Sequence, residues 1–589
     1  MQDKKVLLSV KDLEVKFRVR GRILTAIRNI SLDIYENESI AIVGESGSGK
    51  SVFTKTFAGM LDSNGFISNG DLIFNDAELA DTVATPTRFD KFLLDVVLER
   101  LNKASKLEFG ADIYKQILAL DGEKKDKYSL DEKEHEAFDD RMDALKFKRT
   151  EAYNLKLTLN SRKERDRIKQ AKAVIVECDK QLKSLEKQRK QAVFAHKKAA
   201  AEDAQFKAYY SQKMAKLKQE YADAVLQEIS DDTKKRNAIL GKEIYLSVGR
   251  YPFRQRMVLI VKLIRALKKV MSLGVNLQDE NQLNAIFDPI AFRVKFLDGT
   301  TETRLHGVCA LNLAKIKYTK DWQQIRGSRI ATVFQDPMTS LNPIITIGKQ
   351  ISSIIIKHQN CSEAQARKKA IELMMKVGIP NAENRYDDYP FQYSGGMRQR
   401  IVIAIALSCQ PKILICDEPT TALDVTIQAQ ILKLIKDLQE EFKYTIVFIT
   451  HDLGVVANVA DRVAVLYAGQ IVELGGVEEV FYDPRHPYTW ALLSSLPQLA
   501  EINTELYSIS GIPPSLYNKI TGDPFAPRNP YCLKVDTLKE APMFKVDGSE
   551  THYAKTWLLD PRAPKIEKPE AIRDIHQKLL KAFNIEEDE

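Results

Sequence analysis

Apolar and polar positions alternate over the first 75 residues in the pattern of short β-strands. Residues 6–17 and 29–44 carry β-branched side chains in alternating or continuous apolar runs, and residues 70–76 form another run that ends in a turn signal. The pattern changes at about residue 77. Residues 136–232 contain no Pro or Gly and are rich in Lys, Glu, Gln and Ala, a composition that predicts long helices.

Two stretches of this helical region repeat apolar residues at spacings of three and four. The first stretch consists of Ile168, Ala171, Ile175, Cys178, Leu182 and Leu185. The second stretch consists of Tyr210, Met214, Leu217, Tyr221 and Ala224. An Ala-rich segment near residues 199–204 separates them, so we expect the two stretches to form an antiparallel helical hairpin.

Other elements follow further along the chain. Residues 252–274 predict a basic amphipathic helix, which could lie on a membrane but is favoured to pack against the core of its own region. Residues 292–305 predict a β-hairpin around an Asp-Gly turn. Strands and helices then alternate from about 316 to 480, and a Pro-rich tail leads to a charged helix at 570–588. The alternation indicates an α/β fold.

Composition adds limits to this picture. A length of 589 residues predicts two to four domains, and 44% hydrophobic with 29% charged residues is ordinary for a globular protein. Because there is no run of about 18 apolar residues and no signal-peptide core, we expect any membrane role to come through a partner. Six cysteines without a CxxC pair are typical of a reducing compartment and argue against a zinc ribbon. Residues 160–220 hold 17 Lys and Arg against 8 Asp and Glu, so the basic charge is concentrated there.

Residues 44–51 fit the phosphate-binding pattern G-x-x-x-x-G-K-[ST]. They follow the apolar strand 39–43 and precede a helix, which is the context that gives the match meaning. Glycines let backbone N–H groups approach phosphate oxygens, and the helix N-terminus adds a positive end. We expect Lys50 to pair with the β- and γ-phosphates of ATP and the Ser51 hydroxyl to ligate Mg²⁺. The nucleotide-binding residues predicted in this loop are Gly44, Glu45, Ser46, Gly47, Ser48, Gly49, Lys50 and Ser51.

Residues 412–418 are an apolar run that ends in two adjacent carboxylates. Asp417 is expected to hold Mg²⁺ through water, and Glu418 to orient or deprotonate the water that attacks the γ-phosphate. An apolar run ending in Asp-Glu is common by itself. The phosphate-binding loop upstream makes the catalytic interpretation the stronger one.

Residues 391–400, FQYSGGMRQR, resemble the signature motif of ABC ATPases, and they precede the paired carboxylates by about twenty residues as in that family. The resemblance implies that Ser394, Gly395 and Gly396 bind the γ-phosphate of ATP held by an opposite subunit. It also implies that Gln335 is the Q-loop glutamine, which contacts Mg²⁺ and the attacking water. His451 is then the switch histidine.

Two further residues take their predicted roles from the same resemblance. Residues 422–424 resemble the D-loop, which places Asp424 at the nucleotide interface. Phe17 lies where the family has an aromatic residue that stacks on adenine, although an aromatic residue in a strand is usually part of a core.

Longer motifs resemble the ATPases of oligopeptide, dipeptide and nickel importers. They are residues 334–343 (FQDPMTSLNP), 418–426 (EPTTALDVT), 484–489 (PRHPYT), 511–514 (GIPP) and 524–528 (PFAPR). The resemblance covers about residues 5–76 and 316–530. It implies an ATPase cassette at 1–76 and 316–480 with a helical subdomain, an importer-type C-terminal extension at 481–589, and an atypical insertion at 77–315.

The resemblance also implies partners and a location. The expected assembly has two ATPases, with a sister chain favoured over a second copy, beneath two transmembrane permeases at the cytoplasmic face of the cell membrane. An extracytoplasmic binding protein would deliver the substrate, for which peptides are favoured over nickel or another small solute. The role of the insertion stays open between a solvated helical appendage and a docking arm for a sister ATPase, a permease or anionic lipid.

Many relatives carry a C-terminal cysteine cluster that holds an iron–sulfur centre. In this chain Asp523 and Asn529 stand where two of the cysteines would be expected, and only Cys532 lies nearby. Because one thiolate cannot hold such a cluster, we expect no iron–sulfur centre.

Three other classes of protein are disfavoured. The ATPase heads of SMC and DNA-repair proteins are also split by a coiled coil, and a basic helical segment would suit nucleic acid. Their coiled coil separates the Q-loop from the signature, whereas Gln335 and Ser394 are only 59 positions apart here, so we expect no nucleic acid partner. Soluble translation-factor ATPases of the ABC type carry two cassettes, and this chain has one. A non-hydrolysing nucleotide switch is disfavoured because every predicted catalytic group is present.

Overall fold

The chain is divided into two units. The computed structural model describes residues 5–19, 22–158, 164–277, 279–287, 290, 292–316, 319–421, 423–495, 509–517, 520–569, 572–573 and 575. The first unit comprises Met1–Thr82, Ile290–Lys295 and Gly307–Glu589, and the second comprises Val83–Pro289 and Phe296–His306. The charged helix predicted at 570–588 falls almost entirely outside the described residues.

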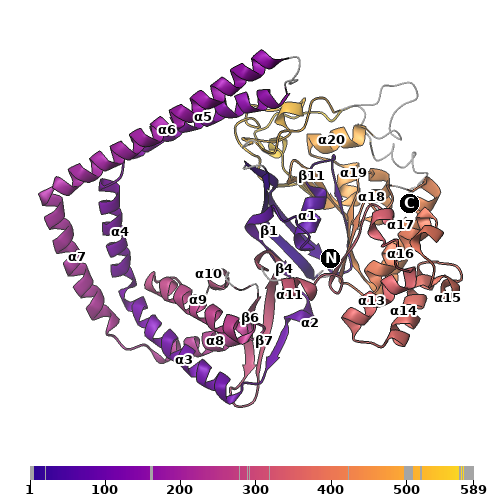
Figure 1. The fold of residues 1–589 in the computed structure, drawn as a ribbon, viewed down its shortest axis with the longest axis horizontal. Helices are drawn as coiled ribbons and strands as arrows, with labels where there is room; N and C mark the ends of the chain where they lie inside the picture. The colour runs from indigo at the N-terminus through magenta and orange to yellow at the C-terminus, as the bar shows by residue number, and fades with distance from the viewer. Residues whose placement is uncertain are drawn as a thin grey trace. The chain divides into compact units, whose positions relative to one another are not determined.

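An antiparallel sheet opens the first unit, as the alternating pattern predicts. Strand β1 (Val6–Val19) lies between β2 (Arg22–Tyr35) and β4 (Gly65–Phe74) (Figure 1). Strand β4 then pairs with the end of β7 (Leu305–Asn312), whose Leu311 lies opposite Phe74. The chain therefore leaves and re-enters this sheet at adjacent positions.

A second sheet of eight strands forms the centre of the first unit and confirms the α/β class. Its strands, in spatial order, are β13 (Phe544–Lys545), β14 (Tyr553–Ala554), β12 (Gln470–Gly476), β11 (Arg462–Tyr467), β3 (Ser39–Val43), β10 (Thr445–Ile449), β9 (Ile413–Asp417) and β8 (Ile330–Val333). From β11 to β8 all neighbours are parallel. Strands β3 and β10 are buried throughout, as continuous apolar runs in a parallel sheet require.

Helices cover this central sheet and form the predicted helical subdomain. They are α1 (Lys50–Phe57), α11 (Thr319–Gln323), α12 (Pro337–Ser340), α13 (Ile347–Gln359), α14 (Glu363–Lys376), α15 (Ala382–Arg385), α16 (Gly395–Leu407), α17 (Val425–Phe442), α18 (Leu453–Val459), α19 (Val477–Tyr482) and α20 (Pro487–Ser494). One apolar core joins the sheet to α13, α14, α16 and α17. Helix α16 is buried along most of its length, because its sequence is apolar on every side.

The C-terminal extension continues the same sheet. Strand β14 pairs with β12, and the imidazole Nε2 of His552 lies 2.8 Å from the buried carboxylate of Glu473. The same carboxylate accepts from the backbone N–H groups of Arg485 and His486. A buried charge with this many donors joins the segment before α20 to the edge of the sheet.

The second unit is built from helices and a β-hairpin. Its helices are α3 (Arg88–Ser105), α4 (Ala111–Lys127), α5 (Glu132–Thr158), α6 (Arg165–Glu202), α7 (Ala204–Val225), α8 (Asp231–Val248), α9 (Phe253–Ser272) and α10 (Glu280–Ile286). Its β-structure includes Phe296–His306, the turn end of the hairpin that β6 (Phe292–Gly299) forms with β7. The short helix α2 (Ala77–Ala80) belongs to the first unit, and strand β5 (Asp81–Ala84) begins in the first unit and ends in the second. Helix α9 packs on α3 and α8 and buries one face, including Leu263 and Leu267. The packed interpretation of its amphipathic sequence is therefore the one that the structure supports.

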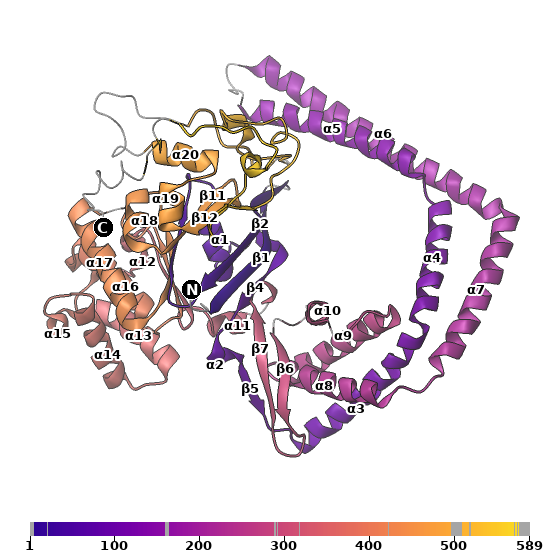
Figure 2. The same ribbon diagram turned by 180° about the vertical axis from the view of Figure 1, so that it is seen from behind.

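The long helices form a hairpin, but with a different turn from the one predicted. Helix α6 packs along α5, and α7 packs along α4, so the two apolar stretches follow one another on the same side of the hairpin (Figures 1 and 2). Ion pairs Arg149–Asp179 and Arg189–Asp139 join α5 and α6 in antiparallel register. The Ala-rich segment is a break at Asp203 between consecutive helices rather than the turn of the hairpin.

This prediction was wrong because the apolar stripe of each helix does not specify its partner. Leu120 of α4 shares a small core with Met214 and Leu217 of α7, and Lys127 pairs with Asp203 at 2.5 Å. Helices α4 and α5 show weaker apolar periodicity than α6 and α7. The sequence pattern therefore does not identify them as the other arm of the hairpin.

Candidate functional site

The carboxyl ends of four parallel strands gather most of the predicted motifs. The phosphate-binding loop follows β3, His451 follows β10, Asp417 ends β9, and Gln335 follows β8. Strand order in the sheet is β3-β10-β9-β8, so these segments are neighbours in space although up to 400 residues separate them in sequence. Ligands of open parallel sheets bind at this edge.

The loop after β3 has the backbone that a phosphate cradle requires. Gly44, Gly47 and Gly49 all have positive φ angles, of 151°, 80° and 106°. A Cβ atom on Gly44 would lie 2.1 Å from the carbonyl oxygen of Leu466, so only glycine fits there. The Ser48 hydroxyl is buried and has no hydrogen-bond partner within the described part of the chain. The loop therefore presents an unused donor beside its backbone N–H groups, which suits a phosphate.

Lys50 and Ser51 begin helix α1 and point toward the acidic end of β9. The Lys50 ammonium donates to the carbonyl oxygens of Gly44 at 2.7 Å and Glu45 at 3.1 Å. Burial lowers the pKa of Lys50, and nearby carboxylates, that of Glu418 first, oppose this shift. The Ser51 hydroxyl donates to Asp417 Oδ1 at 3.2 Å. Burial raises the pKa of Asp417, and the hydrogen bond from Ser51 counteracts it.

Glu418 is the centre of a hydrogen-bonded cluster. Its carboxylate accepts from Gln335 Nε2 at 2.7 Å and from the Thr421 hydroxyl at 3.1 Å, and it lies 3.1 Å from His451 Nδ1. The backbone of Glu418 is left-handed, with φ 46°, and its N–H donates to the carbonyl of Ile449. This strained turn directs the carboxylate toward both partners from neighbouring strands. Thr421 was not predicted as a site residue, because a hydroxyl three residues after a carboxylate is not a distinctive signal.

A cavity of about 600 Å³ contains most of the predicted nucleotide-binding residues. Its predicted lining residues are Phe17, Ser46, Gly47, Gly49, Lys50, Ser51, Gln335, Asp417 and Glu418. Phe17 lies at the apolar end, beside Leu24. Leu516 and Tyr517 of the C-terminal extension also line this end and were not predicted. They lie in a segment without periodicity, and Thr25 N donates to the Leu516 carbonyl at 3.3 Å.

The signature residues do not line this cavity. Ser394 is exposed and caps α16, accepting a hydrogen bond from Met397 N at 3.4 Å. Gly395 and Gly396 form the first turn of that helix, and a Cβ on Gly396 would lie 2.7 Å from Ile427. Asp424 caps α17 through Ile427 N at 3.0 Å. Ala422 of the predicted D-loop lies outside the described residues.

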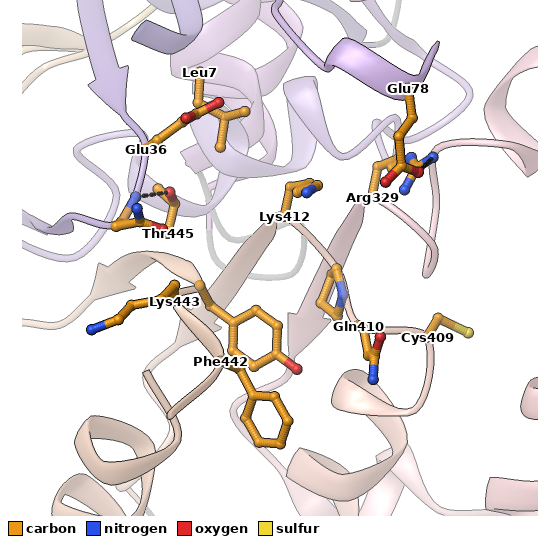
Figure 3. Close-up of a pocket in the computed structure, with 13 residues that line it drawn as sticks. Leu7, Glu36, Glu78, Arg329, Cys409, Gln410, Lys412, Phe442, Lys443 and Thr445 are labelled. Carbon is orange, nitrogen blue, oxygen red and sulfur yellow. Dashed lines mark hydrogen bonds and ion pairs between the residues drawn. The ribbon is translucent and has the colours of Figure 1, made fainter. Parts of the chain in front are cut away.

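A second cavity, of about 460 Å³, lies at the opposite edge of the sheet (Figure 3). Its lining includes Asn37, Lys412 and Arg329, which precede strands β3, β9 and β8, and Arg329 pairs with Glu78 at 2.7 Å. Within the part of the chain that the structure describes, none of the residues predicted to bind the nucleotide or to act in hydrolysis lines it. The candidate nucleotide site is therefore the cavity at the carboxyl edge.

The C-terminal segment around Arg528 does not have the ligands of an iron–sulfur centre. Asp523 Oδ1 accepts from Phe525 N, and Asn529 Oδ1 accepts from Tyr531 N, both at 2.9 Å. Both side chains thus shape the turn by bonding the backbone, and Cys532 is the single thiol of the segment. Within the described residues no group of three or more His, Cys, Asp or Glu has the arrangement of a metal site.

Two protein-family models match this chain. The family model described as ABC transporter matches residues 27–270 and 301–421, and that described as oligopeptide/dipeptide transporter, C-terminal region, matches 472–535. No described helix has the length and apolar character needed to cross a bilayer.

Three curated relatives have high identity to this chain. The oligopeptide transport ATP-binding protein AmiE of Streptococcus pneumoniae is 64% identical over 268 residues, which cover 46% of this chain and 75% of that protein. The oligopeptide transport ATP-binding protein OppD of Bacillus subtilis is 59% identical over 265 residues, covering 45% and 74%. The dipeptide transport ATP-binding protein DppD of Lactococcus lactis is 59% identical over 256 residues, covering 43% and 72%.

Two substitutions in the phosphate-binding loop should differ in effect. Gly44→Ala places a Cβ against backbone, whereas a Cβ on Gly47 would meet no atom within 4 Å. We expect Gly44→Ala to lower the free energy of unfolding by about 3 kcal/mol through overpacking, and Gly47→Ala by about 1 kcal/mol through left-handed strain alone. Chemical denaturation of both purified variants measures this, and equal losses would show that the space at Gly44 is not limiting.

Proposed function

The chain belongs to the ABC transporter family and is an ATP-hydrolysing subunit, and we propose that the transporter it serves imports oligopeptides or dipeptides. The observation that supports the catalytic part best is the position of Glu418, bonded to Gln335 and 3.1 Å from His451 at the edge that also carries Lys50. The peptide substrate is inferred from the relatives, whose names refer to oligopeptide or dipeptide transport. Nickel or another small solute is the alternative within the same group of importers.

Each predicted site residue has a proposed role in hydrolysis. Lys50 and the loop N–H groups bind the phosphates, and Phe17 stacks on adenine at the apolar end of the cavity. Glu418 takes the proton of the attacking water or orients it. Gln335 and His451 hold Glu418 from two sides and are positioned to contact the water and the γ-phosphate.

The residues also fit a Mg²⁺ ion. The Ser51 hydroxyl and the Asp417 carboxylate are 3.2 Å apart, and both line the nucleotide cavity together with Gln335. Hydroxyl, carboxylate and amide oxygens are ligands that Mg²⁺ prefers. When bound with ATP, the ion would neutralise charge on the phosphates.

We propose that the signature residues act on the nucleotide of a second ATPase. Ser394 and Gly395 are exposed at the N-terminus of α16 and lie outside the cavity of their own chain. An exposed helix N-terminus provides N–H donors for an anion brought by a partner. Asp424 caps α17 through a backbone N–H, with Val425 82% exposed beside it, a surface suited to the same interface. A sister ATPase is favoured over a second copy.

The remaining partners follow from the proposed transport role. Two transmembrane permeases would bind the ATPases at the cytoplasmic face of the membrane, and an extracytoplasmic binding protein would supply substrate. We further propose that residues 77–315 are an insertion atypical of the family, and no nucleic acid partner is expected.

Glu418→Gln should trap the ATP-bound, closed state of the ATPase pair. Removing the base should lower the hydrolysis rate at least 100-fold while ATP stays bound. Lys50→Ala should instead abolish nucleotide binding and hydrolysis together, because the phosphate charge loses its partner. Hydrolysis rates and retained ATP are measured on the purified transporter.

Thr421→Val is the matched control for that experiment. It removes one hydrogen bond to the Glu418 carboxylate but leaves the base in place. Its rate should therefore fall much less than that of Glu418→Gln. Undiminished turnover in Glu418→Gln would show that another group activates the water.

No iron–sulfur centre is proposed for this chain. Anaerobically purified protein should contain less than about 0.1 iron per chain, because a single thiol cannot satisfy a cluster that four thiolates normally hold. Stoichiometric iron with a visible absorption band would contradict this and would require ligands other than those described.

Purification of the tagged chain from its native membranes in mild detergent tests the proposed assembly. Two polytopic permeases and a second ATPase should accompany it, and the associated binding protein should bind peptides. Recovery of the chain alone, or with nucleic acid and no permease, would contradict the proposed role.

A further inference from the structure

Arg528, in the C-terminal extension, binds the phosphate-binding loop directly. Its guanidinium donates to both carboxylate oxygens of Glu45, at 2.8 and 3.0 Å, and its side chain is 5% exposed. The other bonds of the group are to Ser510 O at 3.1 Å, Tyr467 Oη at 3.2 Å and Ile509 O at 3.4 Å. These contacts use all three guanidinium nitrogens, so the planar group has one orientation.

Glu45 is itself bonded to the parts of the loop that receive phosphate. Its carbonyl accepts from the Lys50 ammonium at 3.1 Å and from Ser48 N at 3.2 Å. Its own N–H donates to the hydroxyl of Tyr488, which is fully buried. The C-terminal extension therefore holds Glu45 at two points, through Arg528 on the side chain and Tyr488 on the backbone.

The scaffold behind these two contacts is rigid. The rings of Tyr467, Tyr488 and Phe525 pack together with centroids 4.6 to 5.4 Å apart. The turn that carries Arg528 is closed by Asp523, whose N–H donates to the carbonyl of Asp536 at 2.7 Å. Aromatic packing and a closed turn limit how far the guanidinium can move from the loop.

A carboxylate in this loop poses an electrostatic problem for an ATP site. Glu45 directly follows Gly44, within a segment whose donors would face several phosphate charges. An unpaired negative charge there would repel the nucleotide, and partial burial would strengthen the repulsion. The Glu45 side chain is 25% exposed, so solvent screens it only in part.

We propose that Arg528 is a positioning residue for ATP: it neutralises the Glu45 carboxylate and fixes the loop, so that nucleotide affinity depends on the C-terminal extension. This rests on the proposed assignment of the loop as the ATP site. No hydrogen bond joins Arg528 to Glu418, Gln335 or His451 in the described residues. Its loss should therefore act on binding rather than on the hydrolytic step.

The test is a double-mutant cycle on the assembled transporter, with Arg528→Gln, Glu45→Gln and the double variant. Two quantities are measured for each: KM and kcat for ATP, and equilibrium binding of a non-hydrolysable ATP analogue. Arg528→Gln should raise KM and the analogue Kd about 10-fold, as expected for leaving a partly buried charge unpaired, with kcat changed less than about 3-fold. Added salt should reduce this effect.

Removing the carboxylate should reverse most of that loss. In the Glu45→Gln background, Arg528→Gln should change the analogue Kd by less than about 3-fold, because no charge is then left unpaired. Arg528→Lys, which keeps the charge but not the two-pronged contact, should fall between the wild type and Arg528→Gln. The double variant and Arg528→Lys both test the proposal even if Arg528→Gln alone folds poorly.

Arg485→Gln is the matched control. Arg485 also lies in the C-terminal extension and pairs with Asp483. Among the described residues it makes no hydrogen bond to the phosphate-binding loop, so ATP affinity should be unchanged. Equal losses from Arg528→Gln with and without Glu45, or no loss at all, would overturn the proposal. A wild-type chain that neither binds nor hydrolyses ATP would instead overturn the proposed function, so the two failures are distinguishable.

Discussion

The hydrogen-bonded register of four parallel strands determines where every group that we propose to act in hydrolysis can lie. Strands β3, β10, β9 and β8 are neighbours, and each delivers one motif at its carboxyl end. Strands β3 and β10 are buried at every position, so they are held between neighbouring strands and covered on both faces. The Glu418 cluster draws its members from the ends of β9, β10 and β8, so it exists only if all three are in register.

The first sheet also brings together segments that more than 200 residues separate in sequence. Phe74 at the end of β4 and Leu311 of β7 are direct partners, so the two ends of the segment between them are adjacent. A long connection of this kind adds little to the free-energy cost of forming the sheet, because loop-closure entropy grows only slowly with the length of the connection. The second unit buries its own apolar residues, as α9 does against α3 and α8.

The C-terminal extension is joined to the ATPase unit by charge as well as by packing. Glu473 and Glu45 are both carboxylates in the central unit, and each is satisfied by groups from the extension. Buried or half-buried charges need such partners, and removing one partner costs more than the pair contributes. The extension is therefore not an independent appendage. Its hydrogen bonds reach the loop that is expected to carry the phosphates.

The sequence alone determined the local elements of the site. The glycines, Lys50 and Ser51 are recognisable because a phosphate cradle needs them at fixed spacing within a single strand–loop–helix segment. The carboxylates after an apolar strand and the helix after the signature are local in the same way. The α/β class followed from the alternation of strands and helices, and the long helices from composition.

Only the tertiary structure decided which distant segments meet. The partner of each long helix, the contact of Arg528 with Glu45 across 483 positions, and the place of Tyr517 at the nucleotide cavity have no signal in periodicity or spacing. An apolar stripe indicates that one face of a helix is buried, but it does not indicate which element covers that face. An arginine in the sequence carries a positive charge, but the sequence does not indicate which carboxylate it pairs with. These contacts depend on how the whole chain packs. Burial and ion pairing arise between surfaces that come together in the fold, so the order of residues in the sequence does not reveal them.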